Sequence, residues 1–552
     1  MSSSDPQMPS KKENPMSRTD SVEIGQVASD SWSTAAPSKS DGTDLSAAII
    51  EAVNHRRLNP RQIQLTAIAG SIGAALFVAI GSGVMSGPLC LLLAFIFWAT
   101  VVFCIAQCQT EIVTLLPLDG SFIRLAGRMV DPALGVAVGW NHFFAQTSYV
   151  IFEATVINTL VEYWGYNQSP AILISISLVL YLAINVYRAD LFGEAEFWLA
   201  LGKVLLAMGL IIFTIVAMLV GSVSGTGKNL EFGQERVILN ASCHSSMPST
   251  LQGSAWEGQM IAGESRDPRR TVPRAFNTIM TRLIVFFIGG CLCVGILVPS
   301  DDPTLTNGSD TYAGASPYVI AMERLQIPVL PSIVNAALIT TIVSAGNAYT
   351  FNASRSLHAL ALDGRAPAFL RKLNKKGVPY MAVIVVMTLS CLAYLALGSS
   401  SAQVLDWILN FCTAATMFNW SVMSFTWIRF NAALKAQGID KKTFLPSVSK
   451  VQPFAGYWAF FWAFLFLWVQ GYSVFVKGNW KVSTFIFNYG IIALASVIGI
   501  GWKIFKRTPF HKSKDVDLVS DLEFFDTLTE HYRHEREAAP VTVKDKIMAK
   551  IF

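Results

Sequence analysis

Long apolar stretches alternate with short polar loops over most of the chain, in a pattern typical of helices that cross a membrane. A spanning helix needs roughly 20 apolar residues, and windows of about 19 residues locate such stretches. We therefore expect an all-α, polytopic membrane protein. The eleven predicted spans are residues 63–87, 88–115, 133–161, 170–187, 196–221, 278–299, 330–357, 379–398, 403–428, 454–475 and 484–505.

Composition agrees with this prediction and narrows the function. Of 552 residues, 52% are hydrophobic and only 14% are charged, whereas a soluble domain usually carries about 25% charged residues. The net charge of +5 does not indicate nucleic-acid binding, because the basic residues lie in short loops beside apolar spans. The eight cysteines form no CxxC pair, and no histidine spacing suits zinc. We therefore predict neither a metal site nor a cofactor.

The chain also lacks the sequence motifs of common enzymes. We find no nucleophile elbow, phosphate-binding loop or dinucleotide fingerprint, and the polar loops are too short for a catalytic domain. The glycine-rich stretch at 221–227 lacks the Lys-Ser/Thr pair of a phosphate-binding loop. The sequence therefore predicts a membrane protein that is not an enzyme.

The first predicted span is interrupted midway by the sequence Gly70-Ser71-Ile72-Gly73. Glycine lowers helix propensity by about 1 kcal/mol relative to alanine, and an unwound turn survives in lipid only where protein buries it or it lines a cavity. Its free N–H and C=O groups can bind a substrate carboxylate, an ammonium group or a coupling ion. Close packing of small residues against a neighbouring helix explains the glycines equally well.

Basic residues cluster in alternate loops, and this predicts the orientation of the chain. By the positive-inside rule, the basic loops and both termini lie in the cytoplasm. Glycosylation sequons that begin at Asn167 and Asn307 fall on the opposite, less basic side. The basic clusters lie at 56–61, 124–128, Arg188, 266–282, 365–376, 435–442 and 503–512.

The same rule requires one crossing that the apolar pattern lacks. The span 196–221 ends outside and the cluster 266–282 lies inside, so the chain crosses again between residues 222 and 265. That stretch holds no run of even a dozen apolar residues. The loops thus predict twelve spans, of which the sixth is weak or truncated.

Five blocks of sequence, in order along residues 50–525, follow the pattern of one family. Residues 69–77 read AGSIGAALF, and residues 117–142 read PLDGSFIRLAGRMVDPALGVAVGWNH. Residues 262–275 read AGESRDPRRTVPRA, residues 344–367 read SAGNAYTFNASRSLHALALDGRAP, and residues 425–438 read FTWIRFNAALKAQG. In these blocks the chain resembles the fungal amino-acid permeases, the yeast amino acid transporter branch of the amino acid–polyamine–organocation superfamily.

The resemblance implies a LeuT-like fold of two five-helix inverted repeats, spans 1–5 and 6–10, followed by two C-terminal helices. In this fold the discontinuous spans 1 and 6 meet around the substrate near the bilayer midplane. The resemblance also implies amino-acid import across the fungal plasma membrane by proton symport. The chain would divide into a disordered cytoplasmic N-terminal tail at 1–55, a permease domain at 56–510 and a cytoplasmic C-terminal tail at 511–552.

By the same resemblance, the α-carboxylate of the substrate binds at the unwound turn of the first span. Free N–H groups and the positive end of a helix dipole suit a carboxylate there. The predicted residues of this turn are Ser71, Ile72, Gly73, Ala74 and Ala75.

Two of the charged residues inside predicted spans are candidate functional groups. Glu153 is about ten residues from either end of its span, and a carboxylate at such depth is by default a candidate functional group. It aligns with a family glutamate that handles the substrate amine or the proton, and a protonated side chain bonded inside the bundle is the alternative. Lys203 corresponds to a fifth-span lysine that changes protonation in related transporters; extension toward the interface is its alternative. We predict Glu153 and Lys203 as proton-coupling residues, with Glu153 also binding substrate.

The second half of the binding site is predicted from the sixth span. Its unwound part corresponds to Ser254, Trp256 and Glu257, which we add to the predicted substrate-binding residues. The aromatic-rich first half that the family has before this point is missing. Side-chain selectivity therefore cannot be predicted from this span.

The leading hypothesis is a proton-coupled amino-acid permease. Its partners would be the substrate, protons, membrane lipid and, on the cytoplasmic tails, a ubiquitin ligase adaptor. One alternative is an amino-acid sensor that signals through its tails with little flux. A further alternative is a non-functional splice or gene-model variant that lacks the first half of the sixth span.

Overall fold

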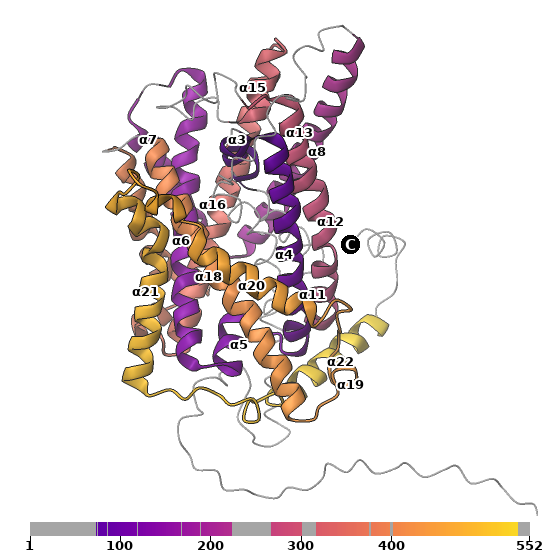
Figure 1. The fold of residues 1–552 in the computed structure, drawn as a ribbon. Coiled ribbons are helices and arrows are strands. Elements are labelled where there is room, and N and C mark those ends of the chain that lie inside the picture. The colour runs from indigo at the N-terminus through magenta and orange to yellow at the C-terminus, as the bar shows by residue number, and fades with distance from the viewer. Residues whose placement is uncertain are drawn as a thin grey trace, which may run out of the picture.

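The described part of the chain is a bundle of helices (Figure 1). The computed structural model describes residue 73 and residues 75–84, 87–118, 120–166, 168–187, 189–223, 267–300, 316–374, 377–397 and 401–538. Within these ranges the regular elements are helical and no strand forms. In chain order they are η1 (Ala75–Ala79), α3 (Ile80–Val84), α4 (Pro88–Leu115), α5 (Ser121–Met129), α6 (Pro132–Val161), η2 (Glu162–Trp164), α7 (Pro170–Tyr187), α8 (Ala189–Val223), α11 (Pro268–Asn277), α12 (Ile279–Arg282), η5 (Leu283–Ile288), α13 (Gly289–Leu297), α15 (Pro317–Arg324), α16 (Leu330–Leu362), η6 (Ala368–Arg371), α17 (Tyr380–Ser390), η7 (Cys391–Leu397), α18 (Ser401–Ala436), α19 (Lys441–Phe444), α20 (Phe454–Val469), η8 (Tyr472–Phe475), α21 (Val482–Lys506) and α22 (Leu522–Ala538).

The predicted all-α, polytopic fold class is confirmed by the apolar helices of the structure. Predicted spans 133–161 and 403–428 form the more polar helices α6 and α18. The predicted sixth span lies in residues 224–266, outside the described residues, so the number of twelve crossings stays a prediction. Seven described helices are long and apolar enough to cross a membrane: Pro88–Leu115, Glu196–Leu219, Pro268–Leu297, Leu330–Leu362, Tyr380–Leu397, Phe454–Phe475 and Val482–Lys506.

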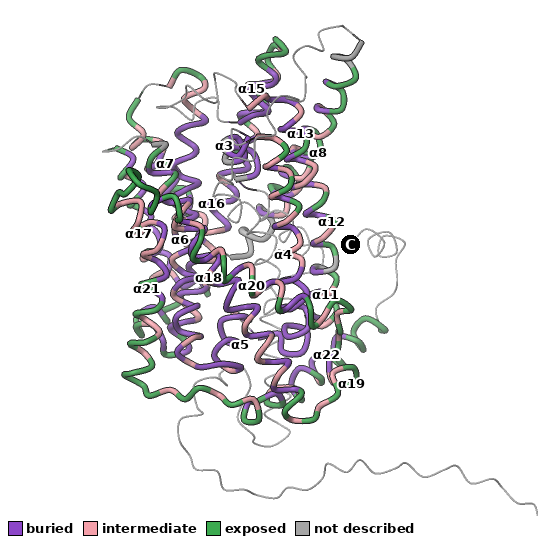
Figure 2. The backbone as a smooth tube through the Cα atoms, viewed as in Figure 1, coloured by how far each residue is buried: buried purple, intermediate pink, exposed green. Residues whose placement is uncertain are grey.

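Helix α6 lies at the centre of the bundle and explains why polar residues are tolerated there. It packs against α5, α7, α16, α18 and α21, so most of its length is buried (Figure 2). Asn141, His142 and Glu153 are each at most 2% exposed. In a membrane, such groups are stable only inside protein, where other polar groups can satisfy them.

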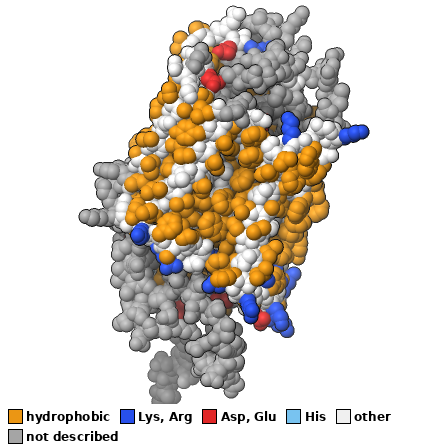
Figure 3. All heavy atoms as spheres, turned by 90° about the vertical axis from the view of Figure 1, so that its left-hand side faces the viewer, with side chains coloured by type: hydrophobic (Ala, Val, Ile, Leu, Met, Phe, Trp, Pro, Cys, Tyr) orange, Lys and Arg blue, Asp and Glu red, His pale blue; other side chains and the backbone are white. Residues whose placement is uncertain are grey.

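The outer helices show the opposite pattern. Large apolar side chains on α8, α20 and α21 face away from the bundle, and Ile500 and Phe505 of α21 are 61% and 81% exposed. Hydrophobic side chains cover much of the face shown in Figure 3, with lysine and arginine near its edges. A continuous apolar surface of this kind is stable against lipid rather than water.

One end of the bundle carries α5, α11, α19 and α22, and we call it the α22 end (bottom of Figure 1). Helix α6 begins here: Pro132 occupies the first turn, and the Asp131 carboxylate accepts a hydrogen bond from the Ala133 N–H at 2.8 Å. Asp131 also binds Lys503 and the Thr508 hydroxyl. This cap therefore holds the start of α6 against the end of α21.

Helix α22 belongs to the segment predicted as the C-terminal tail. Its apolar side chains are buried, namely those of Phe524, Phe525, Leu528 and Tyr532. The opposite side of the helix is exposed and charged, as an amphipathic surface helix requires. Residues 511–538 thus form part of the packed structure at the α22 end.

Candidate functional site

The interrupted part of the first span meets α6 and α16 inside the bundle. A Cβ added to Gly73 would lie 3.1 Å from Oε1 of Glu153, 3.7 Å from Cβ of Ala345 and 3.8 Å from the Tyr349 hydroxyl. A contact of 3.1 Å is tighter than most real Cβ contacts, so the absence of a side chain allows the Glu153 carboxylate to approach the backbone. Glu153 itself is 2% exposed.

The helix that follows Gly73 is irregular. The Leu76 N–H donates to the Gly73 carbonyl at 3.2 Å, and residues 75–79 then form the π-helical turn η1 before α3 begins. Single π-turns are rare and occur frequently at functional sites. The described residues that follow the predicted break therefore depart from α-helical geometry.

The structure places only some of the predicted site residues. Gly73 and Glu153 lie together, whereas Lys203 belongs to a separate cluster on α8. Ala75 begins η1, but its side chain is outside the described part of the structure. The remaining predicted residues, Ser71, Ile72, Ala74, Ser254, Trp256 and Glu257, also lie outside the described residues.

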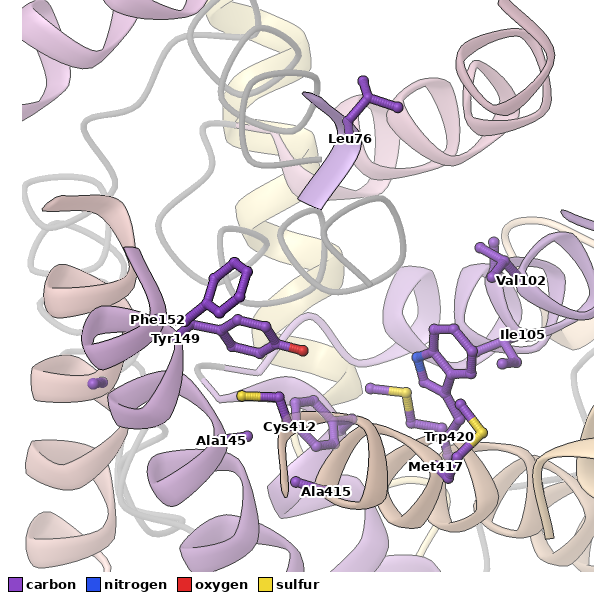
Figure 4. Packing of buried hydrophobic residues seen from close by; sticks show 14 of the residues in the cluster. Leu76, Val102, Ile105, Ala145, Tyr149, Phe152, Cys412, Ala415, Met417 and Trp420 are labelled. Carbon is purple, nitrogen blue, oxygen red and sulfur yellow. The ribbon is translucent and has the colours of Figure 1, made fainter. Parts of the chain in front are cut away.

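A pair of tyrosines lies beside the Glu153 carboxylate. Tyr149, one turn before Glu153 on α6, stacks on Tyr349 of α16 with ring centroids 4.9 Å apart. Its hydroxyl lies 3.4 Å from the Thr416 hydroxyl of α18. Figure 4 shows Tyr149 on α6 pointing toward the helix that carries Cys412. The tyrosines thus line the region where α6, α16 and α18 meet.

Helix α7 contributes a third tyrosine. A Cβ added to Gly346 would lie 2.3 Å from the Tyr181 hydroxyl, so the phenol occupies the space over this glycine of α16. Tyr181 is fully buried and lies within electrostatic range of Glu153. Asn185, one turn further along α7, donates to the side-chain oxygen of Asn347 at 2.8 Å. Helices α7 and α16 are therefore joined by the packing of Tyr181 over Gly346 and by the hydrogen bond between Asn185 and Asn347.

Lys203 is buried rather than extended toward the surface. Its ammonium lies 3.5 Å from Oε1 of Glu196, and both side chains are 1% exposed. The Ser344 hydroxyl of α16 lies 3.0 Å from each oxygen of that carboxylate. The lysine, the glutamate and the serine form one cluster, which we call the Glu196 cluster.

The described residues of this site can bind a polar or charged group. The Glu153 carboxylate can accept a proton or an ammonium group beside the Gly73 backbone. Among the described residues, no three His, Cys, Asp or Glu side chains gather as metal ligands would.

Comparison with known proteins identifies the family. A family model for "Amino acid permease" matches residues 62–515. The chain belongs to the amino acid permease family. This permease is 36% identical over 511 residues to the general amino acid permease AGP2 of Saccharomyces cerevisiae, with 88% of this chain and 84% of that protein covered. It is 33% identical to a proline-specific permease of Emericella nidulans, with 86% and 90% covered.

A solved structure is also similar to the permease. It is that of Mhp1, a nucleobase-cation-symport-1 family transporter, in a closed conformation with bromovinylhydantoin bound. The TM-score is 0.43 at 15% identity, with 87% of this chain and 97% of that chain covered.

The α22 end of the permease is held by buried ion pairs. Arg124 of α5 donates to both oxygens of Asp363 at 2.8 and 3.3 Å. Arg365 lies 3.5 Å from the same carboxylate. Burial lowers the pKa of Arg365 to about 10, because the neighbouring Asp363 only partly offsets it. The Arg365 guanidinium is therefore charged at neutral pH, and it shares the Asp363 carboxylate with Arg124.

Glu111 forms a second buried junction, at the end of α4. Its carboxylate accepts from the Trp427 indole at 2.8 Å and from the Ser449 N–H at 2.9 Å, and it pairs with Lys441 at 2.7 Å. Glu111 therefore anchors the connection between α18 and α20.

The C-terminal segment is tied to α5 and α11 by further ion pairs. Arg128 of α5 contacts Asp517 at 3.1 Å and Asp521 at 2.9 Å. Arg269 pairs with Asp526, and the Arg536 guanidinium lies 2.7 Å from Asp267. Because α11 continues directly into the apolar helix that ends at Leu297, the C-terminal segment contacts the base of a membrane-spanning helix.

Sequence reasoning missed the tyrosines and the partners of the charged residues. Tyr149 precedes Glu153 by four residues, and this spacing on a helix would have placed it on the same face. Ser344 and Asp363 gave no comparable signal, because their partners lie 148 and 239 residues away along the chain. Such pairs form only when the helices pack.

Proposed function

We propose that this permease imports amino acids across the plasma membrane of a fungal cell by proton symport. The observation that carries the proposal is the approach of the Glu153 carboxylate to Gly73, at the break in the first span. A backbone break and a buried carboxylate are the two groups that a zwitterionic substrate needs. Membership in the amino acid permease family supports the substrate class.

In this proposal the unwound turn holds the α-carboxylate, and Glu153 faces the α-ammonium group or carries the coupled proton. Substrate and proton binding drive exchange only if they bind the outward and inward states with different affinity. Removal of the charge on Glu153 would abolish that difference. The Glu153 carboxylate is thus proposed as a ligand and, together with Lys203, as a proton-coupling group.

We further propose that the α22 end faces the cytoplasm. Basic side chains from the separate helices α5, α11, α19 and α21 gather there, among them Arg124, Arg269, Lys441 and Lys503. The positive-inside rule places such basic segments on the cytoplasmic side. Both tails would then be accessible to a ubiquitin ligase adaptor.

Uptake of labelled amino acids in a permease-deficient yeast tests the proposal. A panel of amino acids first identifies a substrate, and uptake is then followed as external pH is varied. Glu153→Gln should lower uptake by roughly tenfold or more and remove its dependence on external pH. Glu162→Gln is the matched control, because Glu162 lies at the end of the same helix and binds Asn158 at 2.6 Å.

Two outcomes would contradict the proposal. If Glu153→Gln reaches the plasma membrane and retains uptake with unchanged pH dependence, Glu153 is not the coupling group. If the natural protein reaches the membrane and binds amino acids without taking them up, it is a sensor rather than a transporter. Sequencing of the transcript across codons 221–263 establishes whether a longer sixth span exists.

A further inference from the structure

The Glu196 cluster is a second buried charged site, and neither its glutamate nor its serine belongs to the predicted binding site. Glu196 and Lys203 are seven residues apart on α8, so both lie on the same face, about two turns apart. Their charged groups nevertheless approach to 3.5 Å. Both side chains therefore extend along the helix toward each other, inside the bundle.

The cluster also joins two helices. Ser344 is fully buried on α16, and its hydroxyl lies at the same distance, 3.0 Å, from both oxygens of Glu196. A hydroxyl in this position stabilises the ionised carboxylate, which in turn stabilises the buried ammonium. The contact between α8 and α16 and the charge on Lys203 consequently depend on each other.

Few of the described groups that pack against the cluster carry a charge. The described elements that pack most closely against α8 are α7, α13 and α16. Helices α7 and α13 contain no Asp, Glu, Lys or Arg. Their polar side chains include Asn185 of α7 and Cys293 of α13, which lies beside Thr214 of α8. On α16, Arg355 and His358 lie about three turns or more beyond Ser344. Glu196 is therefore the carboxylate closest to Lys203 in the described structure.

The same short segment of α16 also contacts the binding site. Ala345 lies against Gly73, Gly346 against Tyr181, and Tyr349 against both Gly73 and Tyr149. Ser344, which immediately precedes them, binds Glu196. A shift of this segment relative to α8 would thus alter the Glu196 cluster and the surroundings of Glu153 together.

We propose that Glu196 and Ser344 are positioning residues for proton coupling: Ser344 holds the Glu196 carboxylate, and Glu196 keeps the Lys203 ammonium charged while α8 is docked on α16. This inference rests on the proposed proton symport. When the two helices separate, the carboxylate loses the serine hydroxyl and the proton on Lys203 is released more readily. In this proposal the charge on Lys203 therefore depends on whether α8 is docked on α16.

The test measures uptake of the identified amino acid by the purified full-length permease in liposomes, as KM and maximal rate across pH. In Glu196→Gln the buried ammonium loses its counter-ion, so the pH profile of uptake should move by about one unit toward acid. Ser344→Ala should move it in the same direction by less, and Ser344→Thr, which keeps the hydroxyl, should restore it. The control is Ser356→Ala, since Ser356 is an equally buried serine of α16 whose hydroxyl donates to the Asn352 carbonyl at 2.8 Å.

The outcomes separate this inference from the proposed function. If uptake by the unaltered permease changes neither with pH nor with an imposed proton gradient, proton symport itself is contradicted. If the unaltered permease is pH-dependent, but Glu196→Gln and Ser344→Ala lower the maximal rate equally at every pH, the cluster is merely structural and the inference is wrong. A pH shift in Ser356→Ala equal to that in Ser344→Ala would also overturn it.

For variants that transport too slowly to assay, thermal unfolding of the detergent-purified permease provides a second readout. The melting temperature of the unaltered protein and of Glu196→Gln is compared across pH. If Glu196 keeps Lys203 charged, the two curves differ in shape; curves that are parallel at all pH values overturn the inference.

Discussion

The centre of the permease and its α22 end both bury charged residues, but they surround them differently. At the centre, Glu196 meets one lysine and one serine hydroxyl. At the α22 end, Asp363 is shared by two guanidinium groups, and Glu111 has three partners from two further elements and a loop. The charges at the α22 end thus have more partners than those at the centre. This difference agrees with the proposal made above that the centre couples protons, while the α22 end holds helices together.

The two regions also differ in how their contacts are distributed along the chain. The central contacts join α6 and α16 to Gly73 of the first span, and they join α7 and α8 to α16. The contacts at the α22 end join α5 and α11 to the C-terminal segment, up to 393 residues away. Substitutions at the centre should therefore mainly change uptake, whereas substitutions at the α22 end should mainly change stability.

The largest expected effect is on stability, from Asp363→Asn at the α22 end. Asp363 is 4% exposed, and its loss leaves Arg124 and Arg365 buried without their carboxylate. Breaking a buried ion pair in this way costs about 3–5 kcal/mol. The measurement is the free energy of unfolding in detergent.

The control for Asp363→Asn is Glu530→Ala, which removes an exposed pair with Arg533 at 3.9 Å. Its effect should stay below about 1 kcal/mol. Equal destabilisation by the two substitutions would remove the distinction between buried and exposed pairs at this end.

A smaller loss of stability is expected from Leu528→Ala in α22. Leu528 is 1% exposed in the apolar contact of this helix, and truncation of a buried leucine costs about 2–5 kcal/mol. Because a helix at the edge relaxes more easily than a core, the lower part of that range is expected. Amide hydrogen exchange along residues 522–538 should speed up, whereas uptake by the remaining folded protein should change little. Loss of uptake without faster exchange would assign α22 to transport instead.

At the centre, Gly73→Ala should mainly affect uptake. The added methyl group would lie 3.1 Å from Oε1 of Glu153, so either the carboxylate or the backbone turn must move. We expect uptake to fall roughly tenfold, equivalent to about 1.4 kcal/mol, with little change in melting temperature. Gly202→Ala on α8 is the control, since nothing lies within 4 Å of its added methyl group. Equal effects of the two substitutions would show that glycine at position 73 has no special role.

The sequence predicted the helices far better than their partners. Apolar runs predict α4, α16 and α21 directly, because lipid requires long apolar helices. A charge such as that of Glu153 and a glycine such as Gly73 are unusual inside a long apolar helix, so both are readily identified from the sequence. The structure brings these two residues together. Ser344 could not be found this way, because a serine inside a span costs little and is common between helices.

At the α22 end, the arginines of α5 also show that the sequence does not predict the partners of charged residues. From the sequence, Arg124 and Arg128 are one of the basic clusters that predict membrane orientation. Their partners, Asp363, Asp517 and Asp521, became visible only when α5 packed against α16 and the C-terminal segment. The sequence thus predicted which side these residues occupy, but not the contacts that they make.

The smallest expected effect comes from Asp517→Asn, at the exposed edge of the α22 end. Burial raises the pKa of Asp517, but the Arg128 guanidinium and hydrogen bonds from Ser520 and Val519 outweigh it, so the pKa lies below its ordinary value of 3.8. The side chain is 48% exposed, so its pair with Arg128 should contribute less than about 1 kcal/mol.

Because the folded-state pKa of Asp517 is lowered, its contribution to stability is complete above its ordinary value of 3.8 and disappears as pH falls through the lower folded value. Asp517→Asn should therefore speed hydrogen exchange of residues 517–522 modestly at neutral pH, and the difference from the unaltered permease should shrink in strong acid. Asp515→Asn, two residues earlier, should cause no comparable change. A larger effect than that of Leu528→Ala would show that this surface pair, rather than the apolar face of α22, holds the C-terminal segment in place.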